Sequence, residues 1–275
     1  MTMSVLPTLN FRRRINLLVW TKRLSLLGGL LAAFVLFASG RFGWAVALLV
    51  VTVLLNGALK SWQMSVRRQF IREAEFPPFI VRKLMAAFPQ LRRGDADLVL
   101  RGLRQFFMAH LRSGRQFVAM PSKVVDEAWH EYILHTRGYQ LWCEAAFGGM
   151  LHHTPAEVLG NDARRNDGLR RTWYWACKEE SIDPRKPSRL PLLFALDAKF
   201  DVEGGFKYTP DCSAIDRAAG SDAYCGTGFS DSGGGSGDAG GFGGSESSSS
   251  GSGGDSGGGD SGSGCGGGCG GGGGD

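Results

Sequence analysis

Side chains that can bind a metal ion are concentrated in one short stretch of the sequence. Four of the five histidines lie between residues 130 and 153, and Asp126 and Cys143 lie beside or within that stretch. Imidazole, thiolate and carboxylate groups are the ligands that zinc and similar divalent ions prefer. The candidate ligands are therefore His130, His152, His153 and Cys143. Asp126 precedes His130 by one helical turn, and we expect its carboxylate to orient the imidazole ring.

The spacing of these residues restricts which of them can share an ion. The sequence contains no Cys-x-x-Cys pair and no His-Glu-x-x-His motif. A helix is predicted at about 123–147, between a Pro-Ser pair and a Gly-Gly pair. On one straight helix His130 and Cys143 would point about 140° apart, so they cannot converge on one ion. A shared site needs the chain to turn back after this helix and bring His152 or His153 beside His130.

Structural roles would explain the same residues without a metal. His130 can hydrogen-bond Asp126, Cys143 can fill the core, and the two adjacent histidines can lie in a tight turn. A nucleophilic role for Cys143 is disfavoured, because thiols on a buried helix face are usually inert. The sequence also has no phosphate-binding loop and no evident Ser-His-Asp arrangement. Catalytic residues are therefore unknown, and the sequence leans away from an enzyme.

Two long apolar runs near the N-terminus predict a transmembrane helical hairpin over residues 24–59. Residues 24–39 and 42–59 contain no charged side chain. As helices they would be about 24–27 Å long, slightly short of a hydrocarbon core of about 30 Å. Only two residues separate the runs, so the helices must be antiparallel. Tryptophans at the ends of the runs can lie at headgroup level and anchor the hairpin: Trp20, Trp44 and Trp62.

A buried hairpin in a soluble protein and a cleaved signal peptide are the alternatives to membrane insertion. Helices that pack in a soluble core usually keep a polar stripe, and neither run has one. Small residues at 38–40 could permit signal cleavage, but the second apolar run would still remain as an anchor. Small residues of the first run are expected to let the two helices approach closely: Gly28, Gly29, Ala32 and Ala33.

Basic residues flank the predicted hairpin and indicate its orientation. Residues 1–23 contain five Lys or Arg residues and more follow from Lys60 onward, whereas the connecting turn carries only Arg41. By the positive-inside rule, both termini are expected in the cytoplasm of a two-pass protein of the bacterial inner membrane. Cysteines of the body would then be thiols or ligands rather than disulfides. Membrane lipid is an expected partner, since basic juxtamembrane residues favour anionic headgroups.

The composition changes sharply along the chain. The last 55 residues hold 26 of the 42 glycines, 13 serines and seven acidic residues, and they contain no Lys or Arg. Such a segment buries too little apolar surface to offset the entropy of ordering, so residues 218–275 are predicted to be disordered. The first 220 residues carry 31 basic and 19 acidic groups, a net charge of +12. The basic residues crowd around the spans, so topology accounts for much of this excess and nucleic-acid binding is not expected.

Residues 60–217 show apolar residues at three- and four-residue intervals, which predicts a helical domain. The expected helices lie at about 62–75, 79–88, 95–111, 123–147 and 166–180, with a further helix beginning at Thr154. The segment 192–210 gives no clear pattern. The predicted fold is all-α and has four parts: a basic segment 1–23, the transmembrane hairpin 24–59, a cytoplasmic helical domain 60–217 and the tail 218–275.

The candidate ligands occur in a recognisable order of residues. Asp-x-x-Trp-His at 126–130 is followed by Tyr139 and Cys143, and then by His-His-Thr-Pro at 152–155. This order resembles the glycine-rich domain-containing protein-like family over about residues 95–160, and the glycine-rich C-terminus is similar as well. Many relatives read Trp-His-x-His where this chain has Tyr132, so the resemblance implies that one possible ligand is missing. The family brings no assigned reaction.

Two functions of different classes follow from the sequence. The leading hypothesis is a membrane-anchored interaction or scaffold module whose helical domain binds a protein partner of unknown identity. The alternative is a metal-binding protein or metal-dependent enzyme that holds zinc or another divalent ion around His130 and His152 or His153.

Overall fold

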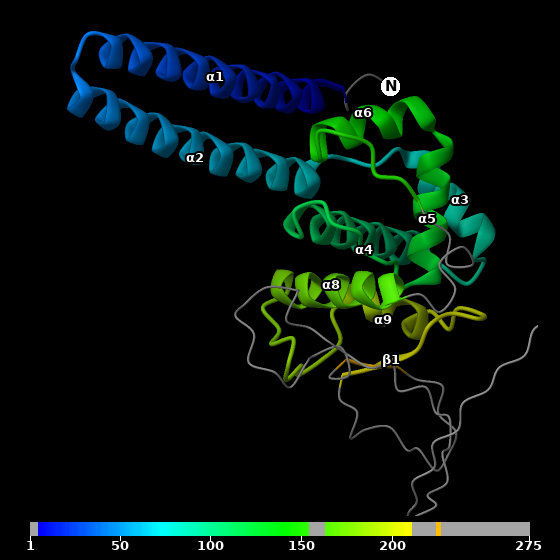
Figure 1. The fold of residues 1–275 in the computed structure, drawn as a ribbon. Helices are drawn as coiled ribbons and strands as arrows, with labels where there is room; N and C mark the ends of the chain where they lie inside the picture. Colours follow the sequence, from blue (N-terminus) through cyan, green and yellow to red (C-terminus); the bar gives the residue numbers. More distant parts are fainter. Residues whose placement is uncertain (1–4, 154–162, 211–223, 227–275) are drawn as a thin grey trace, which may run out of the picture.

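The computed structural model describes residues 5–153, 163–210 and 224–226. Within these ranges the fold is all-helical, as predicted, apart from a parallel pair of two-residue strands. The elements are α1 (Val5–Ala38), α2 (Phe42–Glu73), α3 (Pro78–Ala87), α4 (Arg93–Arg112), α5 (Lys123–Leu134), α6 (Thr136–Ala146), α8 (Ala163–Glu179), α9 (Leu192–Lys199), β1 (Tyr208–Thr209) and β2 (Tyr224–Cys225). In Figure 1, α1 and α2 form a hairpin that projects from a body made by the other helices. The helix predicted from Thr154 and almost all of the predicted tail lie outside the described residues.

The hairpin helices approach closely where small residues face the neighbouring helix. A Cβ on Gly29 would lie 2.3 Å from Thr52 Oγ1, so only glycine leaves room for this side chain. Ala33 of α1 and Ala45 of α2 are buried in the same contact layer. Gly28 has no neighbouring atom within 4 Å. The prediction of a small-residue contact is thus confirmed for Gly29 and Ala33 and is wrong for Gly28 and for Ala32, which is exposed.

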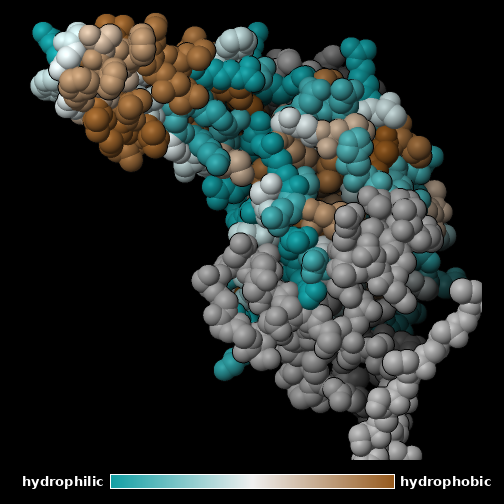
Figure 2. Space-filling view, viewed as in Figure 1, coloured by the Kyte–Doolittle hydropathy of each residue, from teal (hydrophilic) through white to brown (hydrophobic). Residues whose placement is uncertain are grey.

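The outer part of the hairpin exposes apolar side chains on nearly all sides. Only 6% of the most apolar window of the first helix and 11% of that of the second is buried. Figure 2 shows this surface as a continuous brown area at the end of the hairpin far from the body. Both helices are long and apolar enough to cross a membrane. Because the described protein leaves them uncovered, they are not core helices of the body.

The strongly polar residue and the tryptophans of the hairpin are placed as expected for helices that cross a membrane. Asn56 Nδ2 donates a hydrogen bond to the carbonyl oxygen of Thr52 at 2.9 Å, so its own helix satisfies it. Trp20, Trp44 and Trp62 are all strongly exposed. Trp44 and Trp62 lie 18 residues apart on α2, or about 27 Å along the helix axis, close to the thickness of a hydrocarbon core.

Both hairpin helices continue beyond their apolar runs and enter the body. They contain 34 and 32 residues, so each is about 50 Å long and exceeds a hydrocarbon core by about 20 Å. The predicted basic segment 1–23 is helical from Val5 onward, and this helix continues without a break into the first apolar run. Ile15 and Leu18 of α1 join the core together with Phe70 of α2.

Helix α4 lies at the centre of the body. It contacts α2, α3, α5, α8 and α9, and nearly every residue from Leu103 to Leu111 is buried. Gly102 has no side chain, which leaves room for Leu196 of α9 and Val125 of α5. The core around α4 is rich in aromatic rings, and Phe107 packs against Trp142 with ring centroids 4.6 Å apart.

The single helix predicted at 123–147 is wrong, because the chain breaks at His135 into α5 and α6. In an uninterrupted helix Trp129 and Tyr139 would lie about 15 Å apart along the axis. The break brings Trp129 Nε1 to 3.0 Å from the Tyr139 hydroxyl. Thr136 and Gly138 have low helix propensity, so the break falls where a helix is least favoured.

Candidate metal site

Asp197 of α9 fixes the beginning of α5, the helix that carries Asp126 and His130. The Asp197 side chain is 3% exposed. It accepts a hydrogen bond from the Ser122 hydroxyl at 2.6 Å and from the first two backbone N–H groups of α5 at 2.7 and 3.1 Å. A carboxylate at this end also interacts favourably with the helix dipole. The sequence did not point to Asp197, which lies in the segment that showed no clear pattern.

Tyr139 of α6 fixes the loop that carries His153. Its hydroxyl donates a hydrogen bond to the carbonyl oxygen of Leu151 at 2.6 Å and accepts one from Trp129 Nε1 at 3.0 Å. Burial raises the pKa of the Tyr139 phenol above its ordinary value, so the hydroxyl stays a donor. The chain reverses after α6 at Gly148, whose φ is +81°. The predicted reversal is therefore confirmed.

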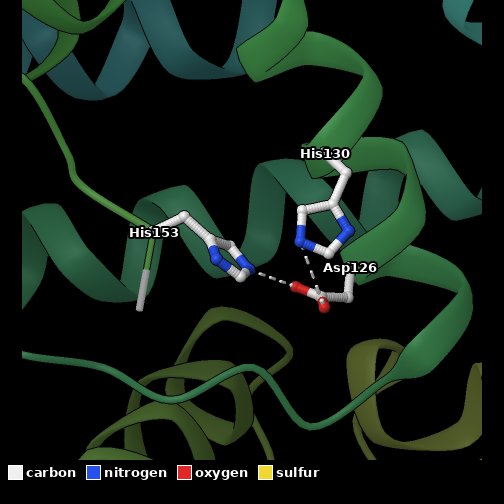
Figure 3. A group of neighbouring side chains, drawn as sticks. All are labelled: Asp126, His130 and His153. Carbon is white, nitrogen blue, oxygen red and sulfur yellow. Dashed lines mark hydrogen bonds and ion pairs between the residues drawn. The ribbon is translucent and has the colours of Figure 1, made fainter. Parts of the chain in front are cut away.

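The side chains of Asp126 and His130, both on α5, meet the side chain of His153 from the loop, as Figure 3 shows. His153 Nε2 lies 2.9 Å from Asp126 Oδ1. His130 Nε2 lies 3.7 Å from Asp126 Oδ2. The two imidazole rings lie beside each other with centroids 4.4 Å apart. One ligand atom from each of the three residues lies within 4.8 Å of the other two.

These separations are close to those of a bound ion. Zinc lies about 2.0–2.2 Å from nitrogen and oxygen ligands, so two tetrahedral ligands are about 3.4 Å apart. His130 is the ligand that must move most, and 45% of its side chain is exposed. His153 is held more firmly, with 13% of its side chain exposed and its ring against Trp129 at 4.6 Å. A rotation of the His130 side chain can therefore bring its ring nitrogen to the distance that a tetrahedral ion needs.

The carboxylate of Asp126 presents one oxygen to each of the two imidazole rings. The sequence suggested that it orients His130 from outside the ligand set, whereas this position suits a direct ligand. Glu127 Oε2 lies 4.0 Å from His130 Nδ1. This separation is too long for a hydrogen bond, so Glu127 does not fix the orientation of the His130 ring in this structure.

His152 and Cys143 are not part of this group. His152 is exposed on the loop and contributes no ligand atom to the group that contains its neighbour. Cys143 is fully buried beneath the loop, against the Tyr139 hydroxyl and the backbone of Leu151. Burial raises the pKa of the Cys143 thiol, so it stays protonated and unreactive. The prediction that Cys143 fills the core is confirmed.

Residue 132 faces away from the group. Tyr132 is 3% exposed, and its ring meets those of Phe76 and Tyr139 edge to face at 5.5 and 5.3 Å. A side chain at this position lies in the aromatic core. The tyrosine therefore removes no ligand from the group formed by Asp126, His130 and His153.

Comparison with known proteins covers the body of the molecule. A family model described as UCP032817-like matches residues 66–229, a stretch that contains Asp126, His130 and His153. The chain matches no curated protein and no solved structure. The matched residues make up more than half of the 275-residue chain, and the protein belongs to the UCP032817-like family.

Proposed function

We propose that this protein is a membrane-anchored metal-binding protein that holds one divalent ion, such as zinc, through Asp126, His130 and His153. The observation that carries the proposal is the convergence of three ligand atoms within 4.8 Å. They come from two segments, and each segment has its own support. Asp197 holds the start of α5, and Tyr139 holds the loop of His153.

A purely structural role explains this arrangement less well. The hydrogen bond between His153 and Asp126 could stabilise the loop without a metal. His130, however, is nearly half exposed, so the core does not need its ring. Two imidazoles that share one carboxylate at a partly exposed position are what a divalent ion requires.

The ligand number indicates what the bound ion could do. Three protein ligands leave at least one coordination position of a tetrahedral ion open to water, as in catalytic rather than structural zinc sites. An ion at such a position lowers the pKa of its bound water to about 7, which suits hydrolysis. Metal binding is the proposal, and hydrolysis is the reaction class to test once binding is measured.

Membrane anchoring by α1 and α2 is the second part of the proposal. Apolar exposure of both helices supports insertion, and the excess of basic residues at their body ends supports cytoplasmic termini in a bacterial inner membrane. Resistance of the full chain to extraction by alkaline carbonate tests insertion. Release of the chain would contradict the anchor and leave the metal site untouched.

The interaction-module hypothesis remains a separate prediction. It requires a specific protein that is recovered with the full chain irrespective of metal. It therefore differs from the metal proposal in its response to chelator, since removing the ion removes the stability that metal binding contributes, whereas recovery of the partner does not depend on the ion.

Metal content of the full chain tests the site directly. The protein is purified in detergent without a metal-binding tag, and its metals are measured by elemental mass spectrometry. About one zinc or similar ion per chain is expected, falling to background in His130→Ala, His153→Ala and Asp126→Asn. His152→Ala is the matched control, since it removes the adjacent exposed histidine and should keep the ion. Metal-free protein that takes up no zinc on titration would refute the proposal.

A further inference from the structure

A hollow of about 480 Å³ lies where α2 leaves its apolar run. One side is a face of α2 that runs from Gly57 through Lys60 and Met64 to Arg68. Arg112, the last residue of α4, and Trp175 of α8 form the other side. Three separate helices therefore line an open hollow with basic and apolar side chains.

The hollow lies at the boundary between the apolar and charged parts of the hairpin. Gly57 belongs to the apolar run, and Lys60 is the first charged residue after it. Figure 2 shows this boundary as a change from brown to teal along the hairpin. The exposed Trp62 marks the same level, as tryptophans do at the lipid headgroups.

Positive charge in and beside the hollow exceeds the negative charge. Glu179 is shared by Arg112 and Arg72, with an oxygen 2.7 Å from a guanidinium nitrogen of each. Lys60 and Arg68 form no ion pair within the described residues. Burial lowers the pKa of Arg112, the negative charge of Glu179 opposes this shift, and the positive charges of Arg72 and Arg68 add to it. Two carboxylates, those of Glu179 and Glu73, thus lie among four cationic side chains, and the site can accept an anion.

Two buried donors on the lining residues have no acceptor among the described residues. They are Arg112 Nε and the indole Nε1 of Trp175. The Arg112 guanidinium lies 5.9 Å from the centre of the Trp175 ring. Buried donors without a partner are uncommon, because each carries an uncompensated desolvation cost. Because these two atoms are themselves inaccessible to solvent, a ligand in the hollow would reach them only after the Arg112 and Trp175 side chains rearrange.

We propose that this hollow binds the phosphate of an anionic phospholipid headgroup. Arginine recognises phosphate through several charge-assisted hydrogen bonds, and basic pockets beside membrane spans favour anionic lipid. A soluble phosphate ion offers the same chemistry, but the lining continues into the apolar surface around Gly57, where an acyl chain can follow. The proposal rests on the membrane anchor proposed above and is independent of the metal site.

Lipid retention by the full chain tests the proposal. The protein is reconstituted into nanodiscs of phosphatidylcholine with or without phosphatidylglycerol, and retained lipid is identified by native mass spectrometry. The unaltered chain should retain phosphatidylglycerol in preference to phosphatidylcholine. The double variant Lys60→Gln/Arg68→Gln should lose this preference by roughly tenfold or more. The matched control Arg13→Gln/Arg14→Gln removes two exposed basic residues of α1 and should keep it.

Each contrary result has a distinct meaning. Failure to insert into phosphatidylcholine nanodiscs would contradict the anchor, whereas insertion without a phosphatidylglycerol preference would overturn the headgroup site alone. Equal losses in both double variants would show general surface attraction and would also overturn it. Binding of inorganic phosphate with the same dependence on Lys60 and Arg68, without retained lipid, would replace the lipid by a soluble ion.

Discussion

The Tyr139 hydroxyl donates a 2.6 Å hydrogen bond to the carbonyl oxygen of Leu151, and this contact holds the loop that ends at His153. The same hydroxyl accepts a hydrogen bond from Trp129 Nε1, and the Trp129 ring lies against His153. Trp129 directly precedes His130 on α5. One buried pair of aromatic residues therefore positions both candidate imidazole ligands.

Tyr139→Phe should weaken both the fold and the candidate site. It removes the donor to Leu151 and leaves Trp129 Nε1 without its acceptor, so the free energy of unfolding should fall by about 1–3 kcal/mol. Zinc affinity should fall as well, since the loop of His153 is released. Denaturant unfolding followed by circular dichroism and a zinc titration measure the two effects. Tyr132→Phe is the control, because that hydroxyl makes no hydrogen bond to the loop among the described contacts. Equal zinc affinity in both variants would contradict the positioning role.

Asp197→Ala should destabilise α5 from its first turn. The change removes the acceptor of the Ser122 hydroxyl, of the first two backbone N–H groups of α5 and of the backbone N–H of Phe206. Buried donors lose a charged partner, so we expect a loss of about 3 kcal/mol in the free energy of unfolding. Asp201→Asn is the control at an exposed position with φ +47°, a conformation that asparagine tolerates. If the two variants unfold at the same denaturant concentration, Asp197 does not hold this helix.

The sequence predicts the helices better than their contacts. The apolar runs and the three- and four-residue periodicity predict the hairpin and the body helices from α2 to α8, because these patterns are local. The break at His135 is not local. It exists because Trp129 and Tyr139 meet across it, and a helix pattern that reads through residues 123–147 cannot show this contact.

The candidate site was predicted only in part, because residue types are local information whereas the contacts between distant residues are not. Histidine and aspartate types identified the right region, but two adjacent histidines cannot be distinguished by type. The path of the loop determines that His153, rather than His152, faces Asp126. Asp197 lies more than seventy residues after the first turn of the helix that it holds. Its local segment carried no signal for this role, since the partners are brought together only by packing of α9 on α4 and α5.

Gly148→Ala should be costly, because two effects add at this position. The residue has φ +81°, and an added Cβ would lie 2.8 Å from Arg67 Nη2. Arg67 is buried and donates a hydrogen bond to the carbonyl oxygen of Ala145 at 2.9 Å, at the end of α6. The backbone strain alone is worth about 1–2 kcal/mol. We therefore expect at least that loss in the free energy of unfolding.

Gly149→Ala provides the comparison for this prediction. A Cβ on Gly149 would have no neighbouring atom within 4 Å, and the φ of this residue is not positive. Its substitution should change the denaturant midpoint little. An equally small change for Gly148→Ala and Gly149→Ala would show that the loop tolerates a side chain at both positions and that Arg67 does not limit it.

His110 should make the body lose stability as the pH falls. The side chain is 7% exposed, its Nδ1 lies 3.1 Å from the carbonyl oxygen of Gln116, and its ring packs edge to face on Phe147. Burial lowers the pKa of His110 from 6.5 to about 4. Below about pH 6.5 the unfolded chain therefore binds a proton that the folded chain refuses. Stability should be intact above that value, fall as the pH decreases toward 4, and lose up to about 3 kcal/mol from this group.

Unfolding free energies of the unaltered chain and of His110→Gln, measured from about pH 7.5 to about pH 4.5, isolate this contribution. The variant should be less stable than the unaltered chain at the upper end, because glutamine fits the pocket against Phe147 poorly. The difference should shrink as the pH falls, since only the unaltered chain loses stability through His110. All other titratable groups are the same in both proteins, so their contributions cancel in the difference. Parallel curves over the whole range would mean that His110 takes up its proton equally in the folded and unfolded chains, and that its burial does not control the acid stability of the body.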